Sequence, residues 1–206
     1  MEGSRRWPDE AECLAILRKA GCSKKVIEHQ RMVERIAVAI ARKMITRCEA
    51  TASQEEERAM CRVYVDLELV RAGALLHDIG RGRTHGIRHA VAGGEMAREM
   101  GLPEELVLII ERHIGAGVER DEAVRFGLPP KDYLPLTIEE KIVAHADNLA
   151  GPHGKIKLAE VLHDLERKGA SHVVPRMEAL HRDLGALCGE DIDEIEINEQ
   201  VDKLTS

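Results

Sequence analysis

Histidines and aspartates that could bind a metal ion stand at the ends of apolar segments of the chain. The stretch AGALLHDIGRGRTHGIRHA, residues 72–90, places His77 and Asp78 side by side directly after an apolar run. Adjacent side chains on a helix point about 100° apart, so such a pair can bind one ion only where the helix ends and the chain turns. The glycines after Asp78 permit that turn. His85 and His89 follow at i and i+4, the spacing that lets two imidazoles meet a single metal.

Three more residues of the same chemistry lie elsewhere at the edges of apolar helical segments. His29 lies near the start of a long one, His113 ends the run LVLIIERH, and Asp147 follows an apolar segment in IVAHADNLAG. Mixed imidazole and carboxylate ligands suit divalent transition metals such as Mn, Fe, Co, Ni or Zn. The chemistry to expect from such a site is activation of water.

The elements that must position these residues are helices. Apolar residues recur at helical spacing almost throughout, alternating strand patterns are nearly absent, and the low aromatic fraction of 2% favours an aliphatic core of helices packed on helices. The predicted fold class is therefore all-α. Helices are expected at about 9–20, 24–47, 51–78, 86–100, 104–114 and 138–151, followed by two or three more that end in the acidic stretch 189–204.

Composition limits the partners and the compartment. A formal net charge of -7 argues against a DNA-binding protein and disfavours RNA as a substrate. No segment is long and apolar enough to enter a membrane. The cysteines are odd in number, lack CxxC spacing and are expected to be free thiols of a cytoplasmic protein: Cys13, Cys22, Cys48, Cys61 and Cys188. The long apolar helices leave room for a homodimer surface.

The order of His29, the string HDIG at 77–80 and the later Asp147 resembles the HD-domain superfamily of metal-dependent phosphohydrolases. The resemblance covers roughly residues 23–150 and implies an HD-domain helical bundle. The single domain would then have three parts: an N-terminal helix in 1–22, the HD core in 23–150, and a C-terminal helical extension in 151–206 packed on the core.

The resemblance also implies a ligand set. The residues that would hold one ion are His29, His77, Asp78 and Asp147. Members with a two-metal centre add histidines downstream of the HD pair, and His89 and His113 take those places here. Asp78 would then bridge the two ions. Because His113 is followed by Ile114 and not by a second histidine, a centre with one metal remains an alternative.

The implied reaction is attack of a metal-activated hydroxide on a phosphoester of a small nucleotide-like substrate, with a cyclic phosphodiester as a candidate. Arg81, directly after HDIG, favours bidentate phosphate binding. Arg83 is a second candidate for substrate binding, and His85 or a metal-bound water is a candidate for protonating the leaving group. Two alternatives stay open: a one-metal nucleotide phosphomonoesterase or triphosphohydrolase, and a non-catalytic, metal-stabilised nucleotide-binding regulatory module.

Four further histidines have no place in this scheme. His153, His163, His172 and His181 are scattered through the C-terminal region and are expected to be exposed to solvent. His145 stands two residues before Asp147, about 200° around the helix, and is expected to face away from the site.

Overall fold

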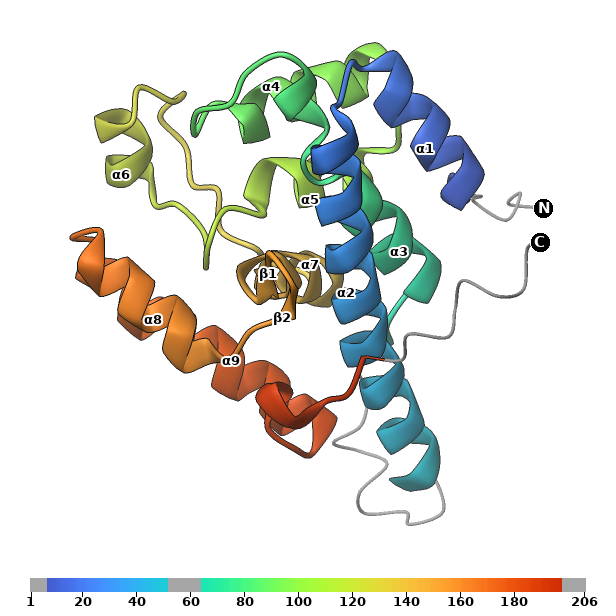
Figure 1. Cartoon of the computed structure of the whole chain (residues 1–206), viewed down its shortest axis with the longest axis vertical. Helices are drawn as coiled ribbons and strands as arrows, with labels where there is room; N and C mark the ends of the chain where they lie inside the picture. Colours follow the sequence, from blue (N-terminus) through green and yellow to red (C-terminus); the bar gives the residue numbers. More distant parts are fainter. Residues whose placement is uncertain (1–6, 52–63, 198–206) are drawn as a thin grey trace.

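The computed structural model of the chain describes residues 7–51 and 64–197 (Figure 1). Apart from one small hairpin, the regular structure in these ranges is helical, which confirms the all-α fold class. The α-helices are α1 Glu10–Lys19, α2 Lys24–Thr51, α3 Leu67–Leu76, α4 His89–Glu99, α5 Glu104–Arg112, α6 Arg120–Arg125, α7 Ile138–Asn148, α8 Leu158–Arg167 and α9 Val174–Cys188. The 3-10 turns are η2 Ile79–Gly82, η3 Ser171–Val173 and η4 Ile192–Glu194, and the hairpin pairs β1 Ala150–Gly151 with β2 Gly154–Lys155 in antiparallel register.

Helix α2 is the central element of the bundle. α3 and α7 pack against it, α1 and α5 pack on α3, and α4 lies on α5 and η2. α9 contacts both α2 and α7, and α8 packs on α9 at the lower left of Figure 1. The α2 face toward the core carries Val33, Ile36, Ile40 and Met44, all buried, as the apolar spacing predicts.

Helix starts follow from side chains that cap backbone N–H groups. Asp9 caps α1 in a capping box with Glu12, and the Ser23 hydroxyl accepts a bond from Val26 N at 3.4 Å at the start of α2. The prediction of one helix over 51–78 is wrong within the described residues, because α3 begins only after Asp66. The Asp66 carboxylate accepts a bond from Leu69 N at 3.0 Å and sets that start; residues 52–63 lie outside the described ranges.

The acidic C-terminal stretch is not the helix that was predicted over 189–204, as far as the structure describes it. Ile192–Glu194 form one 3-10 turn, and Ile195 continues in extended backbone. The ammonium group of Lys155 donates bonds to the carbonyl oxygens of Ile192, Asp193 and Ile195. These oxygens therefore accept bonds from a side chain and not from the backbone N–H groups of a helix.

Two predictions about single residues are also wrong. His181 is buried, with 7% of its surface exposed, because its ring lies between α7 and the turn after α9. Cys48 is disulfide-bonded, so it is not a free thiol; Cys13, Cys22 and Cys188 are free and buried, and Cys61 lies outside the described residues.

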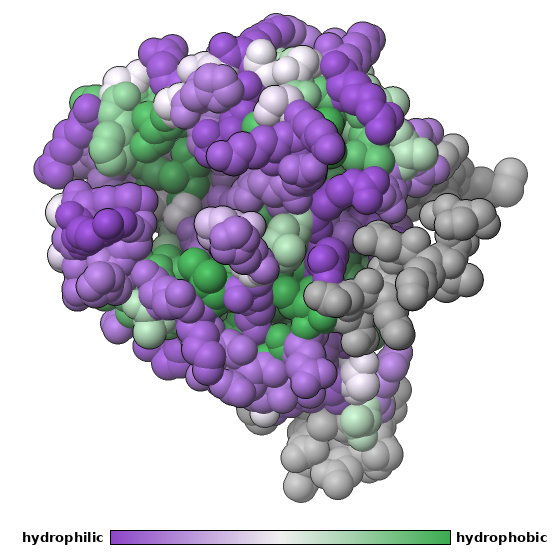
Figure 2. Space-filling model, in the orientation of Figure 1, coloured by the Kyte–Doolittle hydropathy of each residue, from purple (hydrophilic) through white to green (hydrophobic). Residues whose placement is uncertain are grey.

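The face shown in Figure 2 is mostly hydrophilic, with apolar groups gathered in patches. Among the described residues no helix is long and apolar enough to cross a membrane.

Candidate metal centre

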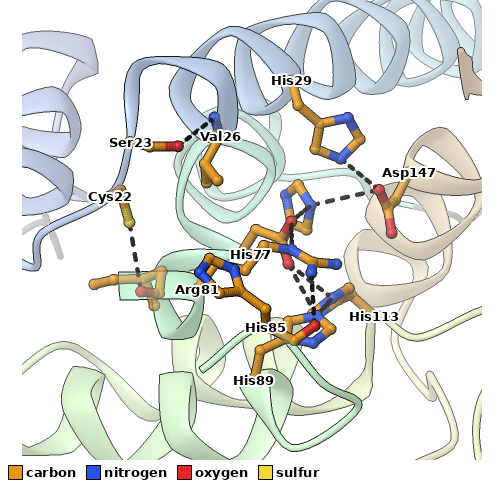
Figure 3. Close-up of polar contacts among 12 residues, drawn as sticks. Cys22, Ser23, Val26, His29, His77, Arg81, His85, His89, His113 and Asp147 are labelled. Carbon is orange, nitrogen blue, oxygen red and sulfur yellow. Dashed lines mark hydrogen bonds and ion pairs between the residues drawn. The ribbon is translucent and has the colours of Figure 1, made fainter. Parts of the chain in front are cut away.

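The six predicted ligands come together inside the bundle in overlapping groups of three. Figure 3 shows five of them with labels: His29, His77, His89, His113 and Asp147. His29 lies on α2, His77 follows α3, Asp78 precedes η2, His89 begins α4, His113 follows α5, and Asp147 is next to last in α7. All of these side chains except that of His29 therefore lie at or next to a helix end, where the chain turns. This is why helices that are apolar along their length end in groups that bind metals.

The first group of ligand atoms lies between α2, α3 and α7. Asp147 Oδ1 is 2.9 Å from Nε2 of His29 and 3.5 Å from Nε2 of His77. His77 is completely buried, whereas about a third of the His29 side chain is exposed, so this side of the centre is open to solvent at His29. His77 Nε2 also lies 3.8 Å from Asp78 Oδ2, which joins this group to the second one.

The second group consists of Asp78, His89 and His113, all buried. Asp78 Oδ1 is 2.9 Å from Nε2 of His89 and 3.6 Å from Nε2 of His113. The carboxylate of Asp78 thus faces the two histidines with one oxygen and His77 with the other. This is the position required of a ligand that bridges two ions.

The tautomers of three histidines are set by the backbone. Nδ1 of His77 donates to the Ala74 carbonyl at 2.7 Å, and Nδ1 of His113 donates to the Ile110 carbonyl at 2.7 Å. Nδ1 of His89 makes the same bond to the Gly86 carbonyl at 2.8 Å. In a neutral ring this leaves Nε2 without a proton and with a lone pair directed to the centre, the usual arrangement of a metal-binding histidine.

These lone pairs have no partner in the protein that would satisfy them. Nε2 of His89 and Nε2 of His113 are 3.0 Å apart, although two unprotonated nitrogens repel each other at that distance. His77 Nε2 and Asp78 Oδ1 are buried and make no hydrogen bond of acceptable geometry. A buried set of this kind is costly unless a cation lies among it, so the residues present fit divalent metal ions.

The electrostatics of the centre also favour a cation. Burial alone would lower the pKa of His77, but the carboxylates of Asp147 and Asp78 raise it to about 9. Burial alone would raise the pKa of Asp78 and of Asp147, but His77 and the other histidines hold both well below their usual range. Burial lowers the pKa of His113, which keeps that imidazole neutral and able to bind a metal.

The backbone of α4 packs so closely on Gly80 that no side chain fits at this position of the HDIG string. A Cβ at this position would lie 1.9 Å from the carbonyl oxygen of His89 and 2.6 Å from the backbone nitrogen of Gly93. The first turn of α4 therefore packs directly on η2, and this contact brings His89 to Asp78. Ile79, between them, is completely buried and anchors the turn in the core.

Arg81, His85 and Arg83 were also predicted to act at the site, and of these Arg81 contacts a ligand residue. Arg81 Nε donates to Asp78 Oδ2 at 2.5 Å, and its Nη1 donates to the His85 carbonyl at 3.3 Å, so its guanidinium lies at the rim of the centre. The His85 side chain is exposed. Arg83 is engaged by the carboxylate of Glu99 on α4, at 2.5 Å, and does not point to the ligands.

Buried charges that support α4 and α5 were missed in the sequence. Glu111, two residues before His113, is 4% exposed and accepts bonds from Arg98 of α4 at 2.7 Å and from Lys131 at 2.7 Å. These bonds fix the ends of α4 and α5 relative to each other, and with them His89 and His113. An acidic residue inside the apolar run LVLIIERH was the available signal.

A second histidine pair lies behind the centre on the opposite face of α7. His145 points away from the ligands, as expected from its position on the helix, and its Nε2 lies 2.9 Å from His181 Nδ1. His181 Nε2 in turn donates to Asp191 Oδ1 at 2.8 Å. This chain of bonds joins α7, which carries Asp147, to α9 and the turn that follows it.

The model of the HD-domain family matches residues 26–151, which is more than half of the chain. The chain therefore belongs to the HD-domain family.

Curated relatives place this domain in different contexts. A tRNA (cytidine(56)-2'-O)-methyltransferase of Thermoplasma volcanium is 44% identical over 188 residues, which are 91% of this chain and 50% of that protein. An uncharacterized protein of Methanocaldococcus jannaschii is 48% identical over 162 residues, 78% of this chain and 87% of that protein. A ribonuclease Y of Acidothermus cellulolyticus is 34% identical over 91 residues, 43% of this chain and 15% of that protein. The chain thus spans about half the length of its methyltransferase relative.

Among solved structures, the HD domain of the L. monocytogenes phosphodiesterase PgpH in complex with cyclic-di-AMP is similar at a TM-score of 0.49 and 16% identity. The match covers 85% of this chain and 94% of that chain.

Proposed function

We propose that this chain is a divalent-metal-dependent phosphohydrolase that cleaves a phosphodiester of a nucleotide. The observation that carries the proposal is the buried ligand set around Asp78. Three of its histidines donate from Nδ1 to backbone carbonyls, and His77 Nε2 and Asp78 Oδ1 are buried without a hydrogen bond of acceptable geometry. Residues 23–150 are the proposed catalytic core, and the flanking helices are proposed to support it.

The residues divide into two ligand groups that share one carboxylate. His29, His77 and Asp147 with one oxygen of Asp78 are proposed to hold one ion, and His89 and His113 with the other oxygen of Asp78 are proposed to hold a second. Ions bound there would be Lewis acids for the phosphoryl group and would lower the pKa of a bound water. Two adjacent groups of this kind suit an in-line displacement at phosphorus, whose attacking and leaving oxygens both need stabilisation.

Arg81 is proposed to bind substrate and to position Asp78 at the same time. Its Nε bond holds Asp78 Oδ2 in place, while about a third of its side chain stays exposed and available to a phosphate oxygen. Arg83 is occupied by Glu99 and is left out of the proposed substrate contacts. His85 is exposed, and we assign it no role within the centre.

The names of two relatives support nucleic acid as the source of the phosphodiester. A tRNA methyltransferase and a ribonuclease both act on RNA by their names, and each shares part of its sequence with this chain. The expectation that RNA is disfavoured rested on the overall charge of -7 alone, which does not describe the charge around the site.

The experiment is metal analysis combined with turnover. The purified chain is dialysed with Mn²⁺, Fe²⁺ or Zn²⁺, its metal content is measured by mass spectrometry, and hydrolysis is assayed on aryl phosphodiesters, aryl phosphomonoesters, cyclic nucleotides and short RNA. We expect diester hydrolysis that requires metal and is abolished in Asp78→Ala, whereas His163→Ala, at an exposed histidine of α8, stays at the wild-type level. Bound metal without turnover on any substrate would favour the regulatory module, and activity only on monoesters would favour the phosphomonoesterase.

A further inference from the structure

The short helix α6 and the residues beside it form an exposed surface of unusual composition, called here the α6 corner. It consists of Arg88, Arg120, Val124, Arg125 and Phe126, all exposed. Phe126 is the single phenylalanine of the chain and is 46% exposed, and Val124 is 56% exposed. Phe126 and Val124 therefore form an exposed apolar pair that is available for contact with a partner.

The α6 corner is built onto the second ligand group. Arg88 directly precedes His89, and its Nη1 donates to the Gly127 carbonyl at 3.3 Å, next to Phe126. Beneath α6, a small apolar cluster joins α4 to the chain after α5. Its members are Val91, Val118, Ala123, Leu128 and Tyr133, with Ile87 and Ile114 packed against it. Ile114 directly follows His113, so both histidines of the second group are next in sequence to residues that contact this segment.

The α6 corner contains three arginines. Among the described residues, Arg88, Arg120 and Arg125 have no carboxylate within ion-pair distance, whereas Arg83 and Arg98 nearby are both paired with glutamates. Exposed acids also lie beside these arginines: Asp121 within α6, and Asp132, whose carboxylate accepts a bond from the backbone nitrogen of Arg120 at 2.8 Å. Glu119 and Glu122 bind Arg176 of α9. The α6 corner therefore exposes an aromatic ring and three arginines that are in no ion pair, with Asp121 and Asp132 beside them.

We propose that the α6 corner binds single-stranded RNA, with a base stacked on Phe126 and the flanking phosphates on the three arginines. This inference rests on the proposed function and names its substrate class. Stacking on an exposed aromatic side chain requires an unpaired base, and arginines bind phosphates without regard to sequence. Exposed Val124 and Phe126 would also suit a protein partner, but three arginines without acidic partners favour a polyanion.

The α6 corner is connected to the second ligand group through Arg88 and Ile114, the sequence neighbours of His89 and His113. This connection suits a polymer that binds the corner and extends to the metal centre. Apolar groups appear at the upper left of Figure 2, over the position that α6 occupies in Figure 1. The α6 corner would act by binding alone and would take no part in bond cleavage.

The test is binding of a fluorescein-labelled, unstructured RNA oligonucleotide to the metal-loaded full chain, followed by fluorescence anisotropy over a series of salt concentrations. We expect Phe126→Ala to weaken Kd about tenfold, and Arg125→Gln to reduce the slope of log K against log salt by about one. Tyr64→Ala is the matched control, because Tyr64 is 84% exposed but lies three residues before α3 and not in the α6 segment. This variant is expected to bind as the wild type does. Circular dichroism and thermal melting show that each variant is folded.

Two results would overturn the proposal. One is equal RNA affinity in the wild type, Phe126→Ala and Tyr64→Ala. The other is absence of RNA binding together with self-association that Phe126→Ala abolishes in sedimentation, which would assign the surface to a second copy of the chain. Because anisotropy does not depend on turnover, failure of the hydrolase proposal in the activity assay remains distinguishable from failure of RNA binding.

Discussion

Gly80→Ala is the change that most directly tests how the fold assembles the metal centre. The backbone angle of Gly80 is one that any residue adopts, so the constraint at this position is space. An added Cβ would meet the His89 carbonyl oxygen at 1.9 Å and the Gly93 Cα at 2.9 Å. Both are backbone atoms of α4, so no side-chain rotation relieves the contact.

The magnitude follows from these distances. η2 and α4 must separate by roughly 1 Å before the contact becomes tolerable, and His89 then moves away from Asp78 by a similar amount. Metal ligands tolerate deviations of about 0.2 Å. We therefore expect the second ligand group to lose its ion, and a misplacement of this size to reduce turnover about 100-fold.

The assay is metal content per chain after dialysis, together with diester hydrolysis and circular dichroism to verify folding. Gly86→Ala is the matched control in the same loop, because a Cβ at Gly86 has no atom within 4 Å. The reasoning is refuted if Gly80→Ala keeps the metal content and turnover of the wild type, or if Gly86→Ala loses as much as Gly80→Ala does.

Three further predictions concern individual side chains. His89→Gln should remove one ion per chain and Asp147→Asn the other, as metal analysis would show; equal loss of all metal from both variants would contradict two separable groups. Lys155→Met should lower the free energy of unfolding in urea by about 2 kcal/mol, because three backbone carbonyls lose their donor; an unchanged midpoint would argue against this role. Burial alone would raise the pKa of Glu122, but the hydrogen bonds from Arg176 lower it below its ordinary value of 4.5. The stabilisation that these bonds give to the folded state is therefore present above pH 4.5 and is lost at lower pH as Glu122 becomes protonated. Arg176→Met should therefore be less stable than the wild type by about 2 kcal/mol at pH 7, with a smaller difference at pH 3, and a difference independent of pH would show that the ion pair contributes nothing.

The sequence alone was enough to predict the fold class and the candidate metal ligands. Apolar spacing along α2 and α5 is a local property, and so is the placement of His77, Asp78 and His113 directly after apolar runs. The ligand chemistry of histidine and aspartate is intrinsic to the side chains. These features are readable before the fold is known, because they depend on residues within a few positions of one another.

Only the tertiary structure decided which partners the remaining polar residues have. Arg81 and Arg83 are equivalent by sequence, but one reaches Asp78 and the other is held by Glu99, sixteen positions along the chain. His181 looked like a surface histidine and is buried, because α7 supplies His145 from a distance of 36 positions. The acidic stretch after α9 was predicted to be a helix, but Lys155 binds three of its backbone carbonyl oxygens. In each case the partner of a side chain comes from a position far away in the sequence. Which group becomes that partner is determined by the packing of the whole bundle.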